Sequence, residues 1–165
     1  MMLSSRFTDS KGTTSEIVYQ DADSFVSLDA SRVRQAYGAC FYGDKLLIVL
    51  HGQRKTWSLP GGTMKPGESF EECLRREVAE ESNMKILTAV PIGYQEVKLD
   101  SGGIFQLRYA CTVEPIGPFV KDSDDEGGII EIKLIDPLTY RDYLHWGAIG
   151  DRIISRALEL TGKKS

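Results

Sequence analysis

The sequence predicts an α/β sandwich with a mixed β-sheet. Short apolar segments of strand length recur along most of the chain, whereas two segments show the 3.6-residue spacing of amphipathic helices. With 165 residues, the chain fits one domain that can bury its own core, and we find neither an internal repeat nor a linker.

The first 15 residues are polar and rich in Ser, Thr and Lys, so we expect 1–15 to be a flexible N-terminus and 16–165 to form the domain. Two short outer strands are expected at 17–19 and 25–28. Two longer apolar runs, 32–42 and 45–51, are joined by Gly43 and Asp44 and predict a hairpin.

A loop is expected over 52–63, where the run Leu-Pro-Gly-Gly at 59–62 favours an irregular, closely packed backbone. The next segment predicts a helix over 70–82. Ser69 and Glu72 have the spacing of a capping box, and Asn83 suits a left-handed residue at the helix end.

Two strands, 86–98 and 105–113, are predicted around a turn at 100–103. An acidic loop over 115–128 leads to a further strand at 129–135. The final helix is expected over 146–160. Its apolar stripe consists of Ile149, Ile153, Ala157 and Leu160.

Three glutamates near the end of the 70–82 helix fall within one narrow arc of its surface: Glu77, Glu80 and Glu81. The same side carries the apolar residues Phe70, Cys73, Leu74 and Val78. Crowded, half-buried carboxylates repel one another, and the helix C-terminus disfavours anions. A hard divalent cation bound through oxygen ligands resolves this conflict. The alternative is an acidic, solvated helix face.

Composition excludes some classes of partner. The net charge of −4 gives no general attraction for a nucleic-acid duplex or an anionic membrane. Cys40, Cys73 and Cys111 are widely spaced and suggest neither a zinc site nor a disulfide framework, and Cys73 is expected in the core. The chain has no 18-residue apolar run and no apolar leader at its start, so we expect a cytoplasmic protein.

The acidic helix belongs to a longer pattern. Gly62 is followed after five residues by Glu68, and after seven more by Arg-Glu-Val-Ala-Glu-Glu-Ser-Asn-Met at 76–84. This pattern resembles the Nudix box of MutT-like hydrolases, G-x5-E-x7-R-E-U-x-E-E-x-G-U, where U is a bulky aliphatic residue. Asn83 is the one departure, in place of the last glycine. The lead-in at 57–61 also looks like that of the family.

The resemblance implies a Nudix-type α/β/α sandwich that hydrolyses a phosphoanhydride in a nucleoside diphosphate linked to another group, with Mg²⁺ or Mn²⁺. By resemblance, the metal ligands are Glu77, Glu80 and Glu81, the Gly61 carbonyl is a further possible ligand, and Glu68 supports them or reaches the metal through water. Arg76 is expected to orient the acids, the alternative being an ordinary intrahelical ion pair.

A carboxylate must help to remove the proton from the attacking water. Glu77 or Glu81 can do so, and a distal glutamate is the other option. Glu126, which ends the acidic run 122–126, is the distal candidate, with a solvated turn as the alternative. Glu131 is a weaker one.

Basic side chains near the glycine loop are candidates for contact with substrate phosphates: Arg54, Lys65 and His51, with Arg54 favoured because a guanidinium binds phosphate bidentately. Aromatic residues of the following strands can either stack on a base or belong to the core: Tyr94, Phe105 and Tyr109.

The leading hypothesis is therefore a Nudix pyrophosphohydrolase, and the alternative is a catalytically silent Nudix-like module that binds a nucleotide or a regulatory partner. Features of the ADP-ribose, diadenosine polyphosphate and coenzyme A subgroups are not found. By elimination, a nucleoside triphosphate or a nucleotide sugar is the expected substrate. A homodimer is possible.

Overall fold

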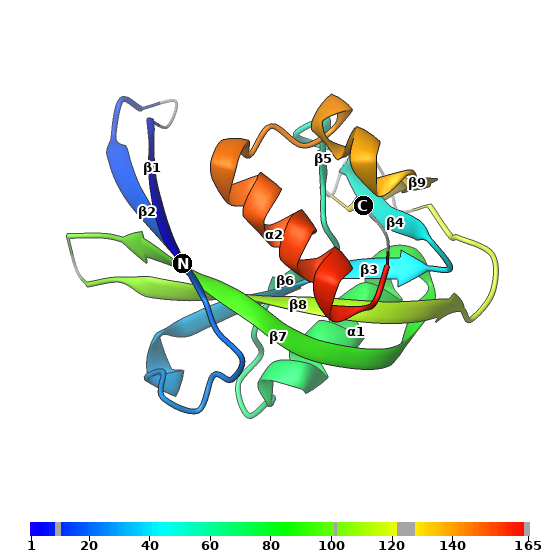
Figure 1. The fold of residues 1–165 in the computed structure, drawn as a ribbon, viewed down its shortest axis with the longest axis horizontal. Helices are drawn as coiled ribbons and strands as arrows, with labels where there is room; N and C mark the ends of the chain where they lie inside the picture. The colour runs from blue at the N-terminus through cyan, green and yellow to red at the C-terminus, as the bar shows by residue number, and fades with distance from the viewer. Residues whose placement is uncertain (9–10, 101, 122–127, 164–165) are drawn as a thin grey trace.

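The chain forms one mixed β-sheet with a helix on each face (Figure 1). This is a computed structural model, and it describes residues 1–8, 11–100, 102–121 and 128–163. The strands are β1 (Met2–Thr8), β2 (Thr14–Asp21), β3 (Val33–Tyr42), β4 (Lys45–His51), β5 (Thr56–Ser58), β6 (Gly61–Thr63), β7 (Met84–Lys98), β8 (Ile104–Pro115) and β9 (Ile129–Ile135). The helices are α1 (Phe70–Ser82) and α2 (Gly147–Leu160), with 3-10 turns η1 (Ala30–Arg32) and η3 (Pro137–Asp142).

The strand order in the sheet is β1-β2-β7-β8-β3-β4-β5, with β6 on β3 and β9 on β4. β3 and β8 run parallel, whereas the other pairs are antiparallel. The predicted mixed sheet is therefore confirmed. So is the hairpin of β3 and β4, whose turn contains Gly43 with φ of 60°.

Helix α1 begins and ends at the predicted residues because local side chains terminate it. The Glu72 amide donates to the Ser69 hydroxyl at 3.1 Å, and the Ser69 amide donates to the Glu72 carboxylate at 3.0 Å. Asn83 is left-handed, with φ 55° and ψ 37°. This small polar residue tolerates that conformation, so the departure from glycine leaves the helix end intact.

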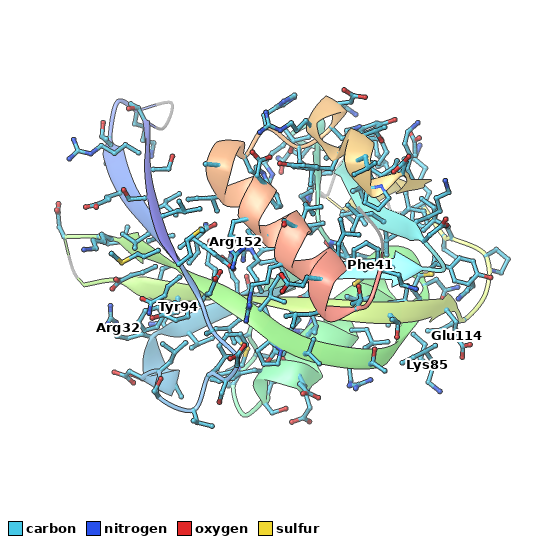
Figure 2. The ribbon with its side chains drawn as sticks, in the orientation of Figure 1. Arg32, Phe41, Lys85, Tyr94, Glu114 and Arg152 are labelled. Carbon is cyan, nitrogen blue, oxygen red and sulfur yellow. The ribbon has the colours of Figure 1, made fainter. Side chains whose placement is uncertain are left out.

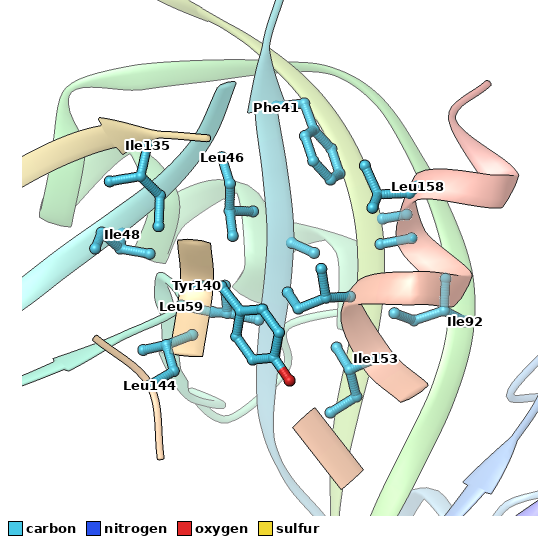
Figure 3. Packing of buried hydrophobic residues seen from close by; sticks show 14 of the residues in the cluster. Phe41, Leu46, Ile48, Leu59, Ile92, Ile135, Tyr140, Leu144, Ile153 and Leu158 are labelled. Carbon is cyan, nitrogen blue, oxygen red and sulfur yellow. The ribbon is translucent and has the colours of Figure 1, made fainter. Parts of the chain in front are cut away.

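Each face of the sheet carries its own apolar core. Helix α2 packs on one face through residues that include Ile153 and Leu158 (Figure 3). Helix α1 packs on the opposite face through Cys73, Leu74 and Val78. Cys73 is buried, as expected, and Cys40 and Cys111 are buried as well. Among the described residues, no helix is long and apolar enough to cross a membrane.

The structure differs from the expectations at several points. Residues 1–15, expected to be flexible, contain β1 and the start of β2, which pair along their whole length. Leu3 packs against the α2 core, a tertiary contact that the polar composition does not signal. The segment at 25–28 is a turn and not a strand, since the Leu28 amide donates to the Phe25 carbonyl at 3.1 Å; the buried Phe25 ring packs against Phe70 and Tyr109.

Two further differences concern the loop 52–63 and helix α2. The loop contains the short strands β5 and β6. Strand β5 pairs with β4, and β6 pairs with β3. On α2, Leu160 is 41% exposed, whereas Ile154 and Leu158 are buried in its place. The apolar face of α2 is thus wider than the single stripe that the sequence suggested.

An ion pair joins β2 to α2. Arg152, labelled on α2 in Figure 2, donates to Asp21 from Nη2 at 2.6 Å and from Nε at 3.1 Å. Burial alone raises the pKa of Asp21, but the hydrogen bonds from Arg152 and its charge outweigh it and lower the pKa to about 2.

We expect Asp21→Asn to lower the free energy of unfolding at pH 7 by about 1–3 kcal/mol, because it removes charge-assisted hydrogen bonds. The folded-state pKa lies below the ordinary value of 3.8, so this stabilisation is present above pH 4 and is lost as the pH falls toward 2. Urea unfolding at pH 7 and pH 3 measures both effects. Asp23→Asn is the control, because Asp23 also pairs with an α2 arginine, Arg156, yet its side chain is 91% exposed. Equal losses in the two variants would contradict the prediction.

Candidate functional site

Strand β6 brings a pair of glycines tightly against β3. Gly61 lies opposite Tyr37, and Gly62 opposite Ala36. A Cβ atom at position 61 would be 2.5 Å from the Tyr37 Cα and would also collide with the Ala36 carbonyl. Only glycine fits there without a backbone shift. The irregular, close-packed loop predicted from the sequence is therefore this short strand.

The acidic end of α1 lies directly on these glycines. The Gly61 amide donates to Glu81 Oε1 at 2.7 Å. A Cβ atom at Gly62 would be 2.6 Å from the Glu77 carboxyl carbon, so the Glu77 carboxylate occupies the space that a side chain would need. Glu77 and Glu81 thus lie against consecutive residues of one strand. Glu80 is more exposed, with 56% of its side chain accessible.

Arg76 connects the acids of the helix with the loop that precedes it. It donates to both Glu68 oxygens, from Nε at 2.6 Å and from Nη2 at 2.9 Å, and to the Thr63 carbonyl at 3.0 Å. Its Nη1 atom donates to Glu77 at 2.7 Å and to Glu80 at 3.3 Å. Arg76 is therefore more than an intrahelical ion pair, since it fixes Glu77 relative to the loop.

These contacts keep the groups charged. Hydrogen bonds from Arg76, and from the Lys65 amide, lower the pKa of Glu68 to about 2. The hydrogen bond to Glu68 in turn raises the pKa of Arg76. Glu68 and Arg76 therefore form an ion pair at neutral pH.

The donor set of the helix suits a hard divalent cation in its chemistry. Glu77, Glu80 and Glu81 offer carboxylate oxygens, which Mg²⁺ and Mn²⁺ prefer over nitrogen or sulfur. Among the described residues, however, no group of three or more His, Cys, Asp or Glu side chains is arranged to hold a metal ion. In this arrangement Glu77 and Glu80 face Arg76 instead. Ion binding by these acids, by Glu68 and by the Gly61 carbonyl stays a prediction.

A cavity of about 800 Å³ lies between the sheet and the start of α2. It is lined by residues of β1, β2, β3, β4, β5, β7 and β8, by the β4–β5 loop, by the residues that precede α2 and by the start of α2. The polar and aromatic lining residues include Arg6, Tyr37, His51, Arg54, Trp57, Gln95, Gln106, Arg108, His145 and Trp146. Tyr37 pairs with Gly61 across β3 and β6, so it connects this cavity to the acidic helix end.

Two of the three predicted basic residues line this cavity. His51 and Arg54 are among its lining residues, whereas Lys65 is not. Lys65 is exposed, and its amide donates to Glu68 at 2.8 Å. His51 Nε2 lies 2.9 Å from the Ser58 hydroxyl. Burial, together with the nearby charge of Arg54, lowers the pKa of His51, so His51 is neutral at pH 7.

The aromatic residues singled out from the sequence belong to packing clusters. Tyr94 packs edge-on against Phe105 at 5.4 Å between ring centroids, and Tyr109 packs against Phe25 at 5.2 Å. The cavity instead contains Tyr37, Trp57 and Trp146. No periodic signal marks these three residues as neighbours, because strands far apart in the sequence bring them together. Only Trp57 could have been associated with the site from the sequence, since it begins the segment that leads into the glycine loop.

The distal acids are less informative. Glu126 lies outside the described residues. Glu131 lies on β9, with 51% of its side chain exposed and its carboxylate 3.9 Å from the Lys133 ammonium. That pair is a weak surface contact.

Comparisons with known proteins agree with this geometry. The NUDIX domain family model matches residues 32–152. The mouse protein named 8-oxo-dGDP phosphatase NUDT18 is 30% identical over 125 residues, covering 70% of this chain and 37% of that protein. The chain therefore spans less than two fifths of the length of this relative.

Solved structures share the fold. A variant of the Bacillus subtilis pyrophosphohydrolase BsRppH has a TM-score of 0.67 and 20% identity, covering 96% of this chain and 98% of that one. The MutT protein from Bacillus halodurans has a TM-score of 0.53 and 23% identity, covering 74% and 79%.

The mixed sheet between two helices, with a glycine strand under an acidic helix, defines a Nudix-type α/β/α sandwich. With the family model matching most of its length, the chain belongs to the Nudix hydrolase family. Members of this family act on nucleotide-type substrates with a divalent metal ion.

The contacts of Arg76 lead to a second prediction. We expect Arg76→Lys to lower kcat about 10- to 100-fold, because an ammonium cannot hold Glu68 and Glu77 in one plane as the guanidinium does. Steady-state kinetics and the melting temperature should be measured together. Arg75→Lys is the control, since Arg75 only pairs loosely with Glu71 at 3.8 Å and caps the Ile86 carbonyl. If Arg76→Lys kept the original kcat, Arg76 would have no orienting role.

Proposed function

We propose that this chain is a divalent-metal-dependent pyrophosphohydrolase that cleaves a phosphoanhydride bond in a nucleotide. The observation that carries the proposal is the placement of the Glu77 and Glu81 carboxylates on consecutive glycines, one of which pairs with Tyr37 in the wall of a cavity lined by basic and aromatic side chains. Negative oxygens shield a pyrophosphate from water, so its hydrolysis needs both charge neutralisation and a base.

Glu77, Glu80 and Glu81 are the residues that would hold the ion, with Glu68 and the Gly61 carbonyl as further contributors. When bound, Mg²⁺ or Mn²⁺ supplies charge neutralisation on the phosphate oxygens. Glu81 or Glu77 accepts the proton of the attacking water, and Glu126 is the alternative base. Arg76 keeps Glu77 in place, while Arg54 and His51 contact the substrate from the cavity wall.

For the substrate, we propose a nucleoside di- or triphosphate. The relatives' printed names include 8-oxo-dGDP, so oxidised guanine nucleotides are the first to test. The cavity supports a nucleotide because Trp57 and Trp146 offer apolar faces to a base, whereas Arg54 offers a bidentate phosphate contact. A nucleotide sugar is the second candidate. The cytoplasm is the proposed location, in keeping with three free, buried cysteines.

The alternative is a catalytically silent nucleotide-binding module. A panel of 8-oxo-dGDP, 8-oxo-dGTP, the unmodified nucleotides and nucleotide sugars should be assayed with Mg²⁺ or Mn²⁺, and products identified by chromatography. Hydrolysis of a nucleotide, abolished by EDTA, is the expected result. Metal-dependent thermal stabilisation without turnover of any member would favour the silent module.

A further inference from the structure

One buried arginine in the cavity has no ion-pair partner in the part of the chain that the structure describes. Arg108, in the middle of β8, is only 6% exposed and lines the cavity. Its Nη1 atom donates to the neighbouring Leu107 carbonyl at 3.3 Å, whereas its Nε–H has no hydrogen-bond partner within the described residues. Buried polar groups in native structures are almost always satisfied, so an orphaned guanidinium N–H calls for an explanation.

Arg108 lies against a π-face, and no carboxylate of the described residues is within hydrogen-bond or ion-pair distance of it. The guanidinium carbon lies 4.7 Å above the centre of the Tyr37 ring, its neighbour across the parallel pair of β3 and β8. Burial lowers the pKa of Arg108 to about 10, and the groups that oppose this shift are Tyr37 and Tyr19. Burial raises the pKa of both tyrosines, so both are neutral at pH 7. The guanidinium is therefore charged and buried, and it forms no ion pair with any described residue.

The described lining residues of the cavity include neither Asp nor Glu. Its other basic side chains differ from Arg108, because Arg6, Arg54 and His145 are exposed and His51 is neutral. A buried cation is costly without a partner, and an unpaired one of this kind is retained most readily where a ligand supplies the missing charge. A low-dielectric wall also strengthens the attraction for an incoming anion.

The position of Arg108 indicates which part of a ligand it meets. Tyr37 packs under Arg108 and at the same time lies opposite Gly61, whose amide contacts Glu81. Arg108 therefore lies at the end of the cavity that adjoins the acidic helix. Phosphates must reach that end if the proposed function holds.

We propose that Arg108 is a substrate ligand that binds a phosphate of the nucleotide from the floor of the cavity. This inference rests on the proposed function for the identity of the ligand. The free Nε–H and its Nη2 neighbour form the edge of the guanidinium that suits bidentate contact with phosphate oxygens.

The test uses inorganic pyrophosphate as the probe, titrated calorimetrically into the full chain in EDTA. The variants are Arg108→Met, which keeps the length of the side chain, and Arg108→Lys, which keeps the charge. We expect pyrophosphate to bind at least 10-fold more weakly to Arg108→Met and to be partly restored by Arg108→Lys. The melting temperature of Arg108→Met should be unchanged or raised, since a buried unpaired charge is removed.

Arg32→Met is the matched control. Arg32, labelled in Figure 2, also lies over an aromatic ring, 4.5 Å from the centre of the Phe105 ring. Unlike Arg108, it forms an ion pair, with Glu96 at 2.7 Å. It is not among the residues that line the cavity. Pyrophosphate affinity in this variant should equal that of the unchanged chain.

Several outcomes would overturn the proposal. The first is that the unchanged chain does not bind pyrophosphate detectably, and the second is that Arg108→Met binds it as tightly as the unchanged chain. The third is that Arg108→Met loses affinity and also melts at a clearly lower temperature, which would assign a structural role to Arg108. A raised KM for nucleotides with unchanged pyrophosphate affinity would place the contact on the base and also overturn it. Because binding in EDTA needs no turnover, an inactive result in the nucleotide panel leaves this test intact.

Discussion

Replacing Glu81 by glutamine is expected to lower kcat by about 10²–10⁴-fold without unfolding the protein. The amide oxygen of glutamine can still accept the hydrogen bond from Gly61, which Glu81 Oε1 accepts at 2.7 Å, so the glycine strand keeps its place. The neutral amide, in contrast, is a poor ligand for a hard cation and cannot take a proton from water. The variant thus separates the structural contact of this side chain from its charge.

Two measurements check this prediction. The first is kcat with a nucleotide from the panel, and the second is the rise in melting temperature on adding Mg²⁺. At Mg²⁺ concentrations 100-fold above Kd, the unchanged chain should gain about 2.7 kcal/mol, or a shift of about 5–10 °C, and Glu81→Gln should lose most of it. Glu71→Gln is the control, because Glu71 lies on the opposite side of α1 and is 53% exposed. Full activity and full Mg²⁺ stabilisation in Glu81→Gln would contradict metal binding at this residue.

The sequence predicted local structure correctly where that structure depends on residues close together in the chain. The capping box of Ser69 and Glu72 and the left-handed Asn83 set both ends of α1, since each depends on residues within four positions. The same helical spacing put Glu77, Glu80 and Glu81 on the apolar side of the helix. Glu77 and Glu81 do contact β6, whereas the Glu80 side chain is 56% exposed. Helix α1 is therefore the part of the site that sequence alone could predict.

The cavity could not be predicted in this way. Tyr37, Arg108 and Trp146 come from β3, from β8 and from the residue that precedes α2, and their proximity depends on the strand order. Arg108 occurs in a mostly apolar strand, where a single charged residue usually indicates an exposed position at the edge of a sheet. Only the parallel pairing with β3 reveals that it is buried against Tyr37. Likewise, β1 was not predicted because the start of the chain is polar, and the strand forms through its pairing with β2.

Replacing each of the two adjacent glycines of β6 by alanine is expected to have different effects: the change at Gly61 lowers stability, and the change at Gly62 lowers kcat. At Gly61, with φ of 152°, the new Cβ would meet backbone atoms, the Tyr37 Cα at 2.5 Å and the Ala36 carbonyl, none of which can rotate away. We expect Gly61→Ala to lower the free energy of unfolding by about 3–5 kcal/mol, from overpacking and backbone strain together.

At Gly62, by contrast, the new Cβ would meet only the end of a side chain, the Glu77 carboxylate, at 2.6 Å. That carboxylate can swing aside, so Gly62→Ala should change the free energy of unfolding by no more than about 1 kcal/mol. Since the displaced group is one of the proposed ion ligands, kcat should fall about 100-fold. Urea unfolding and steady-state kinetics on both variants provide the comparison. A stable Gly61→Ala would refute the close packing of β6 on β3, whereas a fully active Gly62→Ala would mean that Glu77 is not needed where it lies.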